Sequence, residues 1–480
     1  MNISAIKIGD KAYWRLILVI GFLSFFLILY RSIILSITYD EVWTYHLSSQ
    51  SIYQICYAPE NFSSANNHVL NSILIKPFIH LFGHKEWVLR LPNVLCFGFF
   101  YVGLVWLMQT LTKQNFIRLV GIIALCSLNY VLDFFSLSRG YGLALGFEMV
   151  SLAAIMHYFT YPSSRYLATS YLFASLAILS NFTWINFYVS LWFVMNMHWI
   201  FLEKGLKVGI LDLIKLNWIP LLLAILMTIL CFKPIAMLRT QDEFRWGANG
   251  WFDSFHTFAK NFAYSDTFWV AILLQALMLA LVVWAGVLFY KNSIKQASVI
   301  SGFSFLFMLL LTIVFVTIVQ RNFFNIKYMD GRKAIMYYPI FLGLGVAMLD
   351  YYYKKNSELV LKLGASISVI FIVHFALVMR LDTVREWYFD AYTKEVCKEI
   401  YRQNNQAKVA MEKKYKSAAD YYNHYVYGNS MQFFLLENEK ANSTSNVDFY
   451  YISMDLDPKI FAEFSRINTY GEDNFLFRKN

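Results

Sequence analysis

The stretch RLILVIGFLSFFLILYRSIILSITYDEVWTYH, residues 15–46, joins a long apolar run to a polar segment that opens with two acids. The apolar part, 15–36, is long enough to cross a bilayer, because a spanning helix needs about 20 mostly apolar residues. No small-residue cleavage site follows it, so we predict an anchor rather than a signal peptide.

The whole chain has this apolar character. Of its 480 residues, 58% are hydrophobic and 15% are charged, and the mean hydropathy is +0.46. Soluble domains usually carry about 25% charged residues, and disordered chains have the opposite bias. The composition therefore predicts a polytopic membrane protein and excludes a soluble or disordered one.

Eleven apolar runs are expected to span the membrane. They lie near residues 15–36, 88–111, 116–132, 141–160, 166–180, 184–202, 216–235, 267–290, 298–319, 334–350 and 360–379. With a cytoplasmic N-terminus, every inside loop carries Lys or Arg, as the positive-inside rule requires. The outside segments are then 37–87, 133–140, 181–183, 236–266, 320–333 and 380–480.

The chain divides into two units by composition. Residues 1–380 are predicted to form an all-α membrane domain, and the more polar residues 381–480 a small soluble α/β domain on the outer face. In the tail, REWYFDAYTKEVCKEIYRQ (385–403) has helical periodicity, and NVDFYYISMDL (446–456) and NFLFRKN (474–480) are typical of strands.

Two of the outer segments are expected to lie at the membrane surface. Residues 69–82 are apolar on one face, which favours an interfacial amphipathic helix. Residues 236–266 are rich in Trp and Phe, as is common at the headgroup level.

Charge and cysteine content exclude two classes of function. The net charge is +10, but the basic residues fall in short clusters between apolar runs, which indicates topology signals rather than a nucleic-acid surface. The five cysteines are scattered and form no CxxC pair, so neither a disulfide framework nor a zinc site is predicted.

An acid pair, Asp40 and Glu41, follows the first predicted span directly. Acids at a membrane boundary can act as a general base, bind a metal or form hydrogen bonds; alternatively, they begin a solvated loop. In the next outer loop, DFFSLSRGYG (133–142), Asp133 and Arg139 either face the same cavity or form a simple salt bridge.

Three further features carry an alternative each. Arg332, in KYMDGRKAIMYYPIF (327–341), either extends to headgroups or holds a lipid phosphate with bidentate contacts. His68, which precedes the amphipathic segment, either has a structural role beside a helix N-cap or is catalytic. Glu86 and Arg90, four residues apart, are expected to form an ion pair on the surface of one helix.

The predicted topology brings these residues to one face of the membrane. A transporter would more commonly place its charged groups near the bilayer midplane, whereas acids and arginines at one interface favour chemistry on a lipid headgroup. The outer segment 320–333 is basic, with Arg321, Lys327, Arg332 and Lys333, which indicates an anionic ligand.

Four local patterns resemble those of the GT-C type, multi-span glycosyltransferases that use polyprenyl-phosphate sugars, especially the family-39-like bacterial enzymes related to protein O-mannosyltransferases and the aminoarabinose transferase of lipid A. The patterns are YDEVWTYH (39–46), NNHVLNSILIKPFIHLFGHKEWVLRLPNVL (66–95), SRGYGLALGF (138–147) and GRKAIMYYPIF (331–341). The resemblance covers much of residues 38–150 and the late span. It does not extend to the C-terminal domain.

The resemblance implies a GT-C-like fold and a role for six residues. Asp40, with its neighbour Glu41, matches the acid pair that acts on the acceptor, and Asp133 matches an acid of the same cavity. Arg139 and Arg332 match positions that hold the lipid-linked phosphate. His68 falls where relatives carry a His or Lys before prolines, although the prolines are absent here.

The implied reaction is transfer of a sugar from a polyprenyl-phosphate donor, with inversion of the anomeric centre, at the outer face of a bacterial cytoplasmic membrane. The acceptor is a glycolipid, a polysaccharide or a protein. No cofactor or metal is predicted, although the acids could bind a divalent ion. The alternatives are a transporter or flippase of lipid-linked sugars, and a scaffold whose tail binds a partner.

Overall fold

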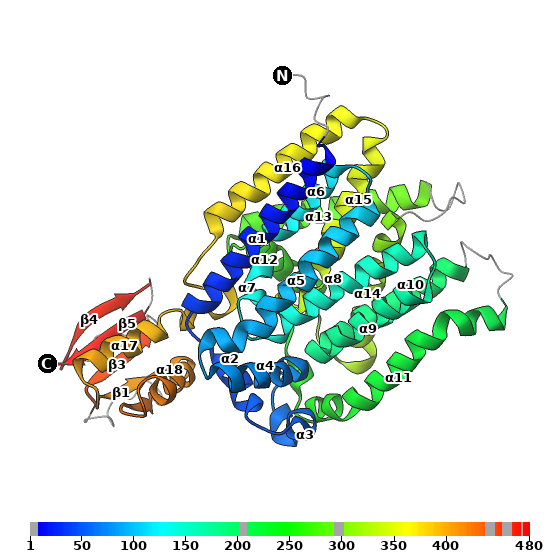
Figure 1. The fold of residues 1–480 in the computed structure, drawn as a ribbon. Helices are drawn as coiled ribbons and strands as arrows, with labels where there is room; N and C mark the ends of the chain where they lie inside the picture. The colour runs from blue at the N-terminus through cyan, green and yellow to red at the C-terminus, as the bar shows by residue number, and fades with distance from the viewer. Residues whose placement is uncertain (1–7, 201–208, 292–301, 437–446, 454–462, 472–473) are drawn as a thin grey trace.

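The computed structural model describes residues 8–200, 209–291, 302–436, 447–453, 463–471 and 474–480. Figure 1 shows a bundle of long helices with a small mixed α/β unit against one end of it. The long helices are α1 (Asp10–Ile34), α5 (Glu86–Leu111), α8 (Gly140–Thr160), α9 (Ser164–Ser180), α10 (Ile185–His198), α11 (Ile210–Thr240), α13 (Phe268–Phe289), α14 (Gly302–Phe324), α15 (Tyr337–Tyr353) and α16 (Ser357–Val378).

Within the described residues, eight helices are long and apolar enough to cross a membrane. A ninth span is possible where α6 (Asn115–Cys126) and α7 (Asn129–Phe135) form one apolar pair bent by 65°. The chain is therefore a multi-pass membrane protein. Eight or nine of the eleven expected spans are thus candidates among the described residues; α9 and α10, with 17 and 14 residues, are shorter than these. Residues 201–202 and 298–301 of the expected spans lie outside the described part.

The bundle is organised around α5 and α8. Every residue of α8 from Gly140 to Met156 is buried, and Gly103 of α5 packs against the α8 backbone so closely that a Cβ there would lie 2.7 Å from the Met149 carbonyl carbon. The small residue permits this close approach. Helices α1, α11, α13 and α16 instead expose many large apolar side chains, which is the surface expected to face lipid.

Short helices close one end of the bundle. They are α2 (Tyr39–Ser48), α3 (Ile52–Tyr57), α4 (Val69–Phe82) and α12 (Trp251–Phe262). The expected helix 69–82 is confirmed as α4. It buries Val69, Asn71, Ser72 and Ile75 and exposes Leu81 and Phe82 at its far end, the pattern of a helix lying on a surface.

The C-terminal unit follows a 3-10 segment, Arg385–Asp390, and contains α17 (Thr393–Gln403), α18 (Lys413–Tyr425) and five strands. The strands are β1 (Lys408–Met411), β2 (Gln432–Leu435), β3 (Phe449–Ser453), β4 (Phe464–Tyr470) and β5 (Asn474–Lys479), in the sheet order β2-β1-β3-β5-β4. β1 pairs in parallel with β2 and β3, and β5 pairs antiparallel with β3 and β4.

The expected helix 385–403 thus consists of the 3-10 segment and α17, and β3 and β5 lie within the predicted strands; residues 454–456 lie outside the described part. The unit packs directly on α2 and on the start of α5, because Val42, Tyr45 and Leu89 share one apolar core with Val396 and Tyr422.

Candidate functional site at the end of the bundle

Helix α2 positions Asp40. Its N-cap is Thr38, whose hydroxyl accepts the Glu41 N–H while the Glu41 carboxylate accepts the Thr38 N–H, a capping box. The backbone N–H of Tyr39, the first residue of α2, donates to Asp390 Oδ2 at 2.6 Å. Thr38 and Asp390 thus fix the start of α2. Asp40 lies in the first turn of this helix and is buried, at 5% exposure.

Two arginines converge on one oxygen of Asp40. Arg139 Nη2 lies 3.4 Å from Oδ2, and Arg332 Nη1 lies 3.3 Å from the same atom. The other oxygen, Oδ1, accepts a hydrogen bond from Asn66 Nδ2 at 3.1 Å. Within the described residues, Asp40 is the one carboxylate that comes within 4 Å of either guanidinium.

Arg139 directly precedes α8 and reaches across to α2. It donates to the Asp40 carbonyl oxygen at 3.1 Å, to Thr44 Oγ1 at 3.2 Å and to Asn66 Oδ1 at 3.1 Å. Gly140 permits this placement, because a Cβ there would lie 2.0 Å from the Ser180 carbonyl oxygen and 2.7 Å from His68 Nδ1. Gly140 is therefore required here because Ser180 and His68 leave no space for a side chain next to Arg139.

Arg332 enters from a different part of the chain. It lies in the 3-10 turn Gly331–Ala334 before α15, after a glycine with φ of +49°. Its guanidinium lies over the rings of Trp387, 5.0 Å from the centroid, and Tyr141, at 5.9 Å. The Arg332 side chain is 28% exposed, compared with 1% for Arg139, so Arg332 is the arginine of the two that solvent can reach.

His68 lies beside these cations as a neutral ring. Burial, and then the charges of Arg139 and Arg332, hold the pKa of the His68 imidazole well below its ordinary value of 6.5. Nδ1 lies 3.1 Å from the Ser180 carbonyl oxygen, so it carries the proton and donates. Nε2 is buried and has no partner in the described residues. An uncharged ring at this point does not add to the positive charge of the site.

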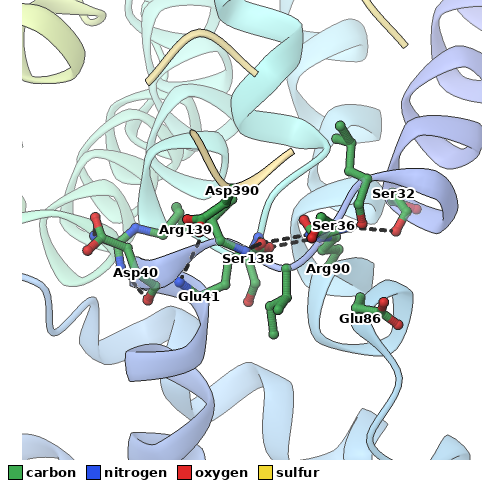
Figure 2. A network of polar contacts seen from close by, with 12 residues as sticks. Ser32, Ser36, Asp40, Glu41, Glu86, Arg90, Ser138, Arg139 and Asp390 are labelled. Atoms are coloured by element: carbon green, nitrogen blue, oxygen red, sulfur yellow. Dashed lines mark hydrogen bonds and ion pairs between the residues drawn. The ribbon is translucent and has the colours of Figure 1, made fainter. Parts of the chain in front are cut away.

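Glu41 turns away from Asp40 and is fully engaged. Its two oxygens accept bidentate contacts from Arg90, Nε to Oε1 at 2.8 Å and Nη2 to Oε2 at 2.7 Å, and the Ser138 N–H donates to Oε1 at 2.6 Å. Figure 2 shows the two acids of α2 diverging, Asp40 beside Arg139 and Glu41 toward Arg90. The expected surface pair of Glu86 and Arg90 is wrong: Arg90 is completely buried, and Glu86 pairs with Lys394 at 2.9 Å.

Asp133 belongs to a second cluster. Its Oδ1 accepts Arg31 Nη2 at 2.6 Å, and its Oδ2 accepts the Tyr264 hydroxyl at 2.9 Å and the Arg385 N–H at 3.1 Å. The structure therefore brings Asp40, Arg139, Arg332 and His68 together, whereas Glu41 and Asp133 are each held by an arginine of their own.

Comparison with known proteins identifies the fold. No family model and no curated protein matches the chain. Among solved structures, an oligosaccharyltransferase of Archaeoglobus fulgidus, in complex with Zn and sulfate, superposes with a TM-score of 0.50 at 12% identity, covering 91% of this chain and 68% of that one. The fold is GT-C-like.

Two other solved structures align over nearly the whole chain with lower scores. One is ArnT from Cupriavidus metallidurans bound to undecaprenyl phosphate, with a TM-score of 0.48, 12% identity and 98% of each chain covered. The other is the arabinofuranosyltransferase AftD from mycobacteria, with a TM-score of 0.44 and 12% identity, covering 97% of this chain and 40% of that one.

Several residues of the site and of the neighbouring Asp133 cluster were not found from the sequence. Trp387 and Asp390 come from the 3-10 segment Arg385–Asp390, and Arg31 comes from the end of α1. The signal for the first two was the aromatic and acidic run REWYFD, which the helical period of 385–403 obscured. Arg31 resembled an ordinary span-end arginine.

Two cavities lie near the candidate site. An apolar one of about 180 Å³ is lined by α12–α15 residues and by Met329 and Ala334, which flank Arg332 in the sequence. A more open one of about 760 Å³ lies at the far end of α2, lined by Tyr45, Lys76 and His84 among others. In the part of the chain that the structure describes, no group of three or more His, Cys, Asp or Glu side chains could hold a metal ion.

Proposed function

We propose that the protein is a membrane glycosyltransferase that moves a sugar from a polyprenyl-phosphate donor to an acceptor hydroxyl. The observation that carries this proposal is the convergence of two arginines on a single carboxylate oxygen. A buried cation needs a counter-charge, and within 4 Å in the described residues these two guanidiniums share one carboxylate. A phosphate suits the planar, multiple donors of arginine.

The donor has an apolar part as well, and the apolar cavity next to Arg332 supports the same proposal. Phe255, Phe258, Leu310 and Tyr337 are among its lining residues. A prenyl chain entering between α12, α14 and α15 would leave its phosphate at the level of Arg332. The GT-C-like fold supports chemistry of this class but does not by itself specify the donor.

The chemistry follows from the groups present. Arg139 and Arg332 take up the phosphate charge, which stabilises the leaving group as the bond between the anomeric carbon and the phosphate oxygen breaks. When the guanidiniums engage the phosphate, the Asp40 carboxylate is released from its ion pairs. It then accepts the proton of the acceptor hydroxyl, whose oxygen forms the new bond to the anomeric carbon. The products are the glycosylated acceptor and polyprenyl phosphate, and attack opposite the phosphate inverts the anomeric centre.

In this proposal Glu41 and Asp133 have supporting roles: they hold Arg90 and Arg31 and so fix α2 and α7 around Asp40. His68, being neutral, borders the donor without contributing a charge to the phosphate. The distribution of basic residues supports a cytoplasmic N-terminus, with the site and the C-terminal unit on the outer face of a bacterial cytoplasmic membrane. The acceptor is a glycolipid, a polysaccharide or a protein.

The test is turnover of radiolabelled lipid-linked sugars from host membranes by the purified protein in detergent. We expect wild type to release polyprenyl phosphate and to move label to a second lipid or polymer, and Arg332→Gln to do neither. Arg245→Gln is the matched control, because Arg245 is an exposed arginine paired with Asp242 at 3.7 Å. Uptake of the labelled lipid into liposomes without a covalent product would instead identify a transporter.

A further inference from the structure

The 3-10 segment Arg385–Asp390, here called the connecting segment, joins the last membrane helix to the C-terminal unit and runs across the site. Its first residue is fixed to the membrane domain: Arg385 donates from Nη2 to Asp266 at 2.7 Å and from Nε to Asn261 at 2.9 Å. Its second residue, Glu386, accepts the Tyr130 hydroxyl. Its last, Asp390, accepts the Tyr39 N–H at the start of α2.

Trp387 lies in the middle of this fixed segment and contacts both arginines of the site. Its ring centroid is 5.0 Å from the Arg332 guanidinium carbon and 5.9 Å from that of Arg139. The side chain is buried at 4% exposure and packs edge-on against Phe134, with the ring centroids 6.2 Å apart. The indole is therefore buried against Phe134, and both guanidiniums lie within 6 Å of its ring centroid.

Two guanidiniums that approach one carboxylate oxygen repel each other, so their positions need support beyond Asp40. The face of an indole attracts cations, and burial strengthens this attraction. The support matters most once the donor phosphate has taken the place of the Asp40 carboxylate, since Arg332 then loses its ion pair with Asp40. Trp387 remains in contact with both cations whichever anion lies between them.

We infer that Trp387 is a positioning residue of the donor-phosphate site, so that the connecting segment makes the C-terminal unit part of the site rather than an accessory to it. The inference rests on the proposed function. It assigns Trp387 no contact with the reacting atoms: the indole acts through Arg139 and Arg332. Its effect is thus specific for the phosphate charge and is absent for an uncharged lipid of the same chain length.

The experiment compares the affinities of two probes, polyprenyl monophosphate and the uncharged polyprenol, for the full-length protein in detergent. The affinity ratio of phosphate to alcohol isolates the contribution of the guanidiniums, because a general disturbance of the lipid site weakens both probes alike. We expect Trp387→Leu to lower this ratio about tenfold, the size of a desolvated cation–π contact or two. Trp387→Phe keeps an aromatic face and should retain the ratio within about threefold.

The matched control is Trp246→Leu, which removes an exposed indole that lies 5.0 Å from the Arg245 guanidinium outside the site. It should leave the ratio unchanged. The inference is overturned if Trp387→Leu keeps the wild-type ratio, or if Trp387→Phe loses as much as Trp387→Leu.

Arg332→Gln, measured in parallel, separates this outcome from failure of the proposed function. If Arg332→Gln lowers the ratio and Trp387→Leu does not, the phosphate site stands and only the role of Trp387 is refuted. If Arg332→Gln leaves the ratio at its wild-type value, the phosphate site itself is refuted.

Discussion

Replacing Asp40 by Asn should produce two opposite effects. In the absence of donor, the Asp40 carboxylate occupies the position between Arg139 and Arg332 that we assign to the donor phosphate. The donor must therefore displace it. Asp40→Asn removes this internal competitor together with the proposed base, so the variant should bind polyprenyl phosphate more tightly while losing turnover.

The size of the gain follows from the two contacts. At 3.3 and 3.4 Å, each ion pair is worth about 5 kcal/mol of Coulomb energy at an effective dielectric constant of about 20. Most of this is offset by desolvation, and charge-assisted hydrogen bonds retain about 1.5–3 kcal/mol net. Since about 1.4 kcal/mol corresponds to a factor of ten, we expect at least tenfold tighter binding. Loss of a general base should lower turnover by about 10² to 10⁴-fold.

The assay measures the Kd of polyprenyl monophosphate for wild type and variant in the same detergent, alongside release of polyprenyl phosphate from labelled donor. Ligand-induced stabilisation gives a second readout: the rise in Tm at saturating ligand should be larger for Asp40→Asn, because its unpaired arginines gain more from the anion. Asp242→Asn makes the same chemical change at an exposed acid that pairs with Arg245, and it should alter neither value.

The reasoning is refuted if folded Asp40→Asn binds polyprenyl phosphate no more tightly than wild type. In that case the carboxylate does not compete with the phosphate and the two ligands do not share a position. Full turnover by the variant would leave the phosphate site intact but remove Asp40 from the role of base.

Three further predictions concern the groups around Asp40. Because the pKa of His68 is depressed in the folded protein, the unfolded chain binds this proton more readily. Wild type should therefore lose stability as pH falls below 6.5, by up to about 1.4 kcal/mol per pH unit. His68→Gln should abolish this part of the pH dependence of Tm. Burial, and then the charges of Asp40 and Glu41, raise the pKa of Asp390 well above its ordinary value of 3.8, so the sign is reversed. Wild type should lose stability as pH rises above 3.8, because the unfolded chain releases this proton first, and Asp390→Asn should remove that loss. A Tm difference between wild type and Asp390→Asn that does not change as pH rises from 3.8 would contradict it. Glu41→Gln leaves Arg90 buried without its counter-charge and should cost about 3–5 kcal/mol in thermal or denaturant unfolding, whereas no measurable change would mean that the ion pair contributes little to the fold.

The membrane helices were largely predictable because crossing a bilayer imposes a length and a composition that a short window of sequence displays. Two of the expected runs do not form a single straight helix of full spanning length in the described residues. The run 116–132 contains a bend of 65° after Cys126, and the run 184–202 contains a described helix of only 14 residues.

Ion-pair partners were harder to predict than the charged residues themselves. Arg90 was assigned to Glu86 because positions four apart share a helix face. Its actual partner, Glu41, is 49 positions away and was the residue taken for a second catalytic acid. Asp40, Arg139 and Arg332 could be identified from their places beside apolar runs, but the sequence held no signal that the first would bridge the other two, or that Trp387 would lie against both.

The buried ion pairs differ in how many arginines each acid pairs with, and this difference supports the roles that we propose. Arg31 pairs with Asp133 and Arg90 with Glu41, one acid to one base, with side-chain exposures of 4% or less. At Asp40 one acid serves two bases, and there alone among these three sites does an arginine reach 28% exposure. Because adjacent residues of a helix point about 100° apart, the neighbours Asp40 and Glu41 meet different arginines. The same two-residue motif thus provides one closed pair that anchors α2 and one under-neutralised, accessible pair. That imbalance, rather than the number of charges, is what an incoming anion would correct.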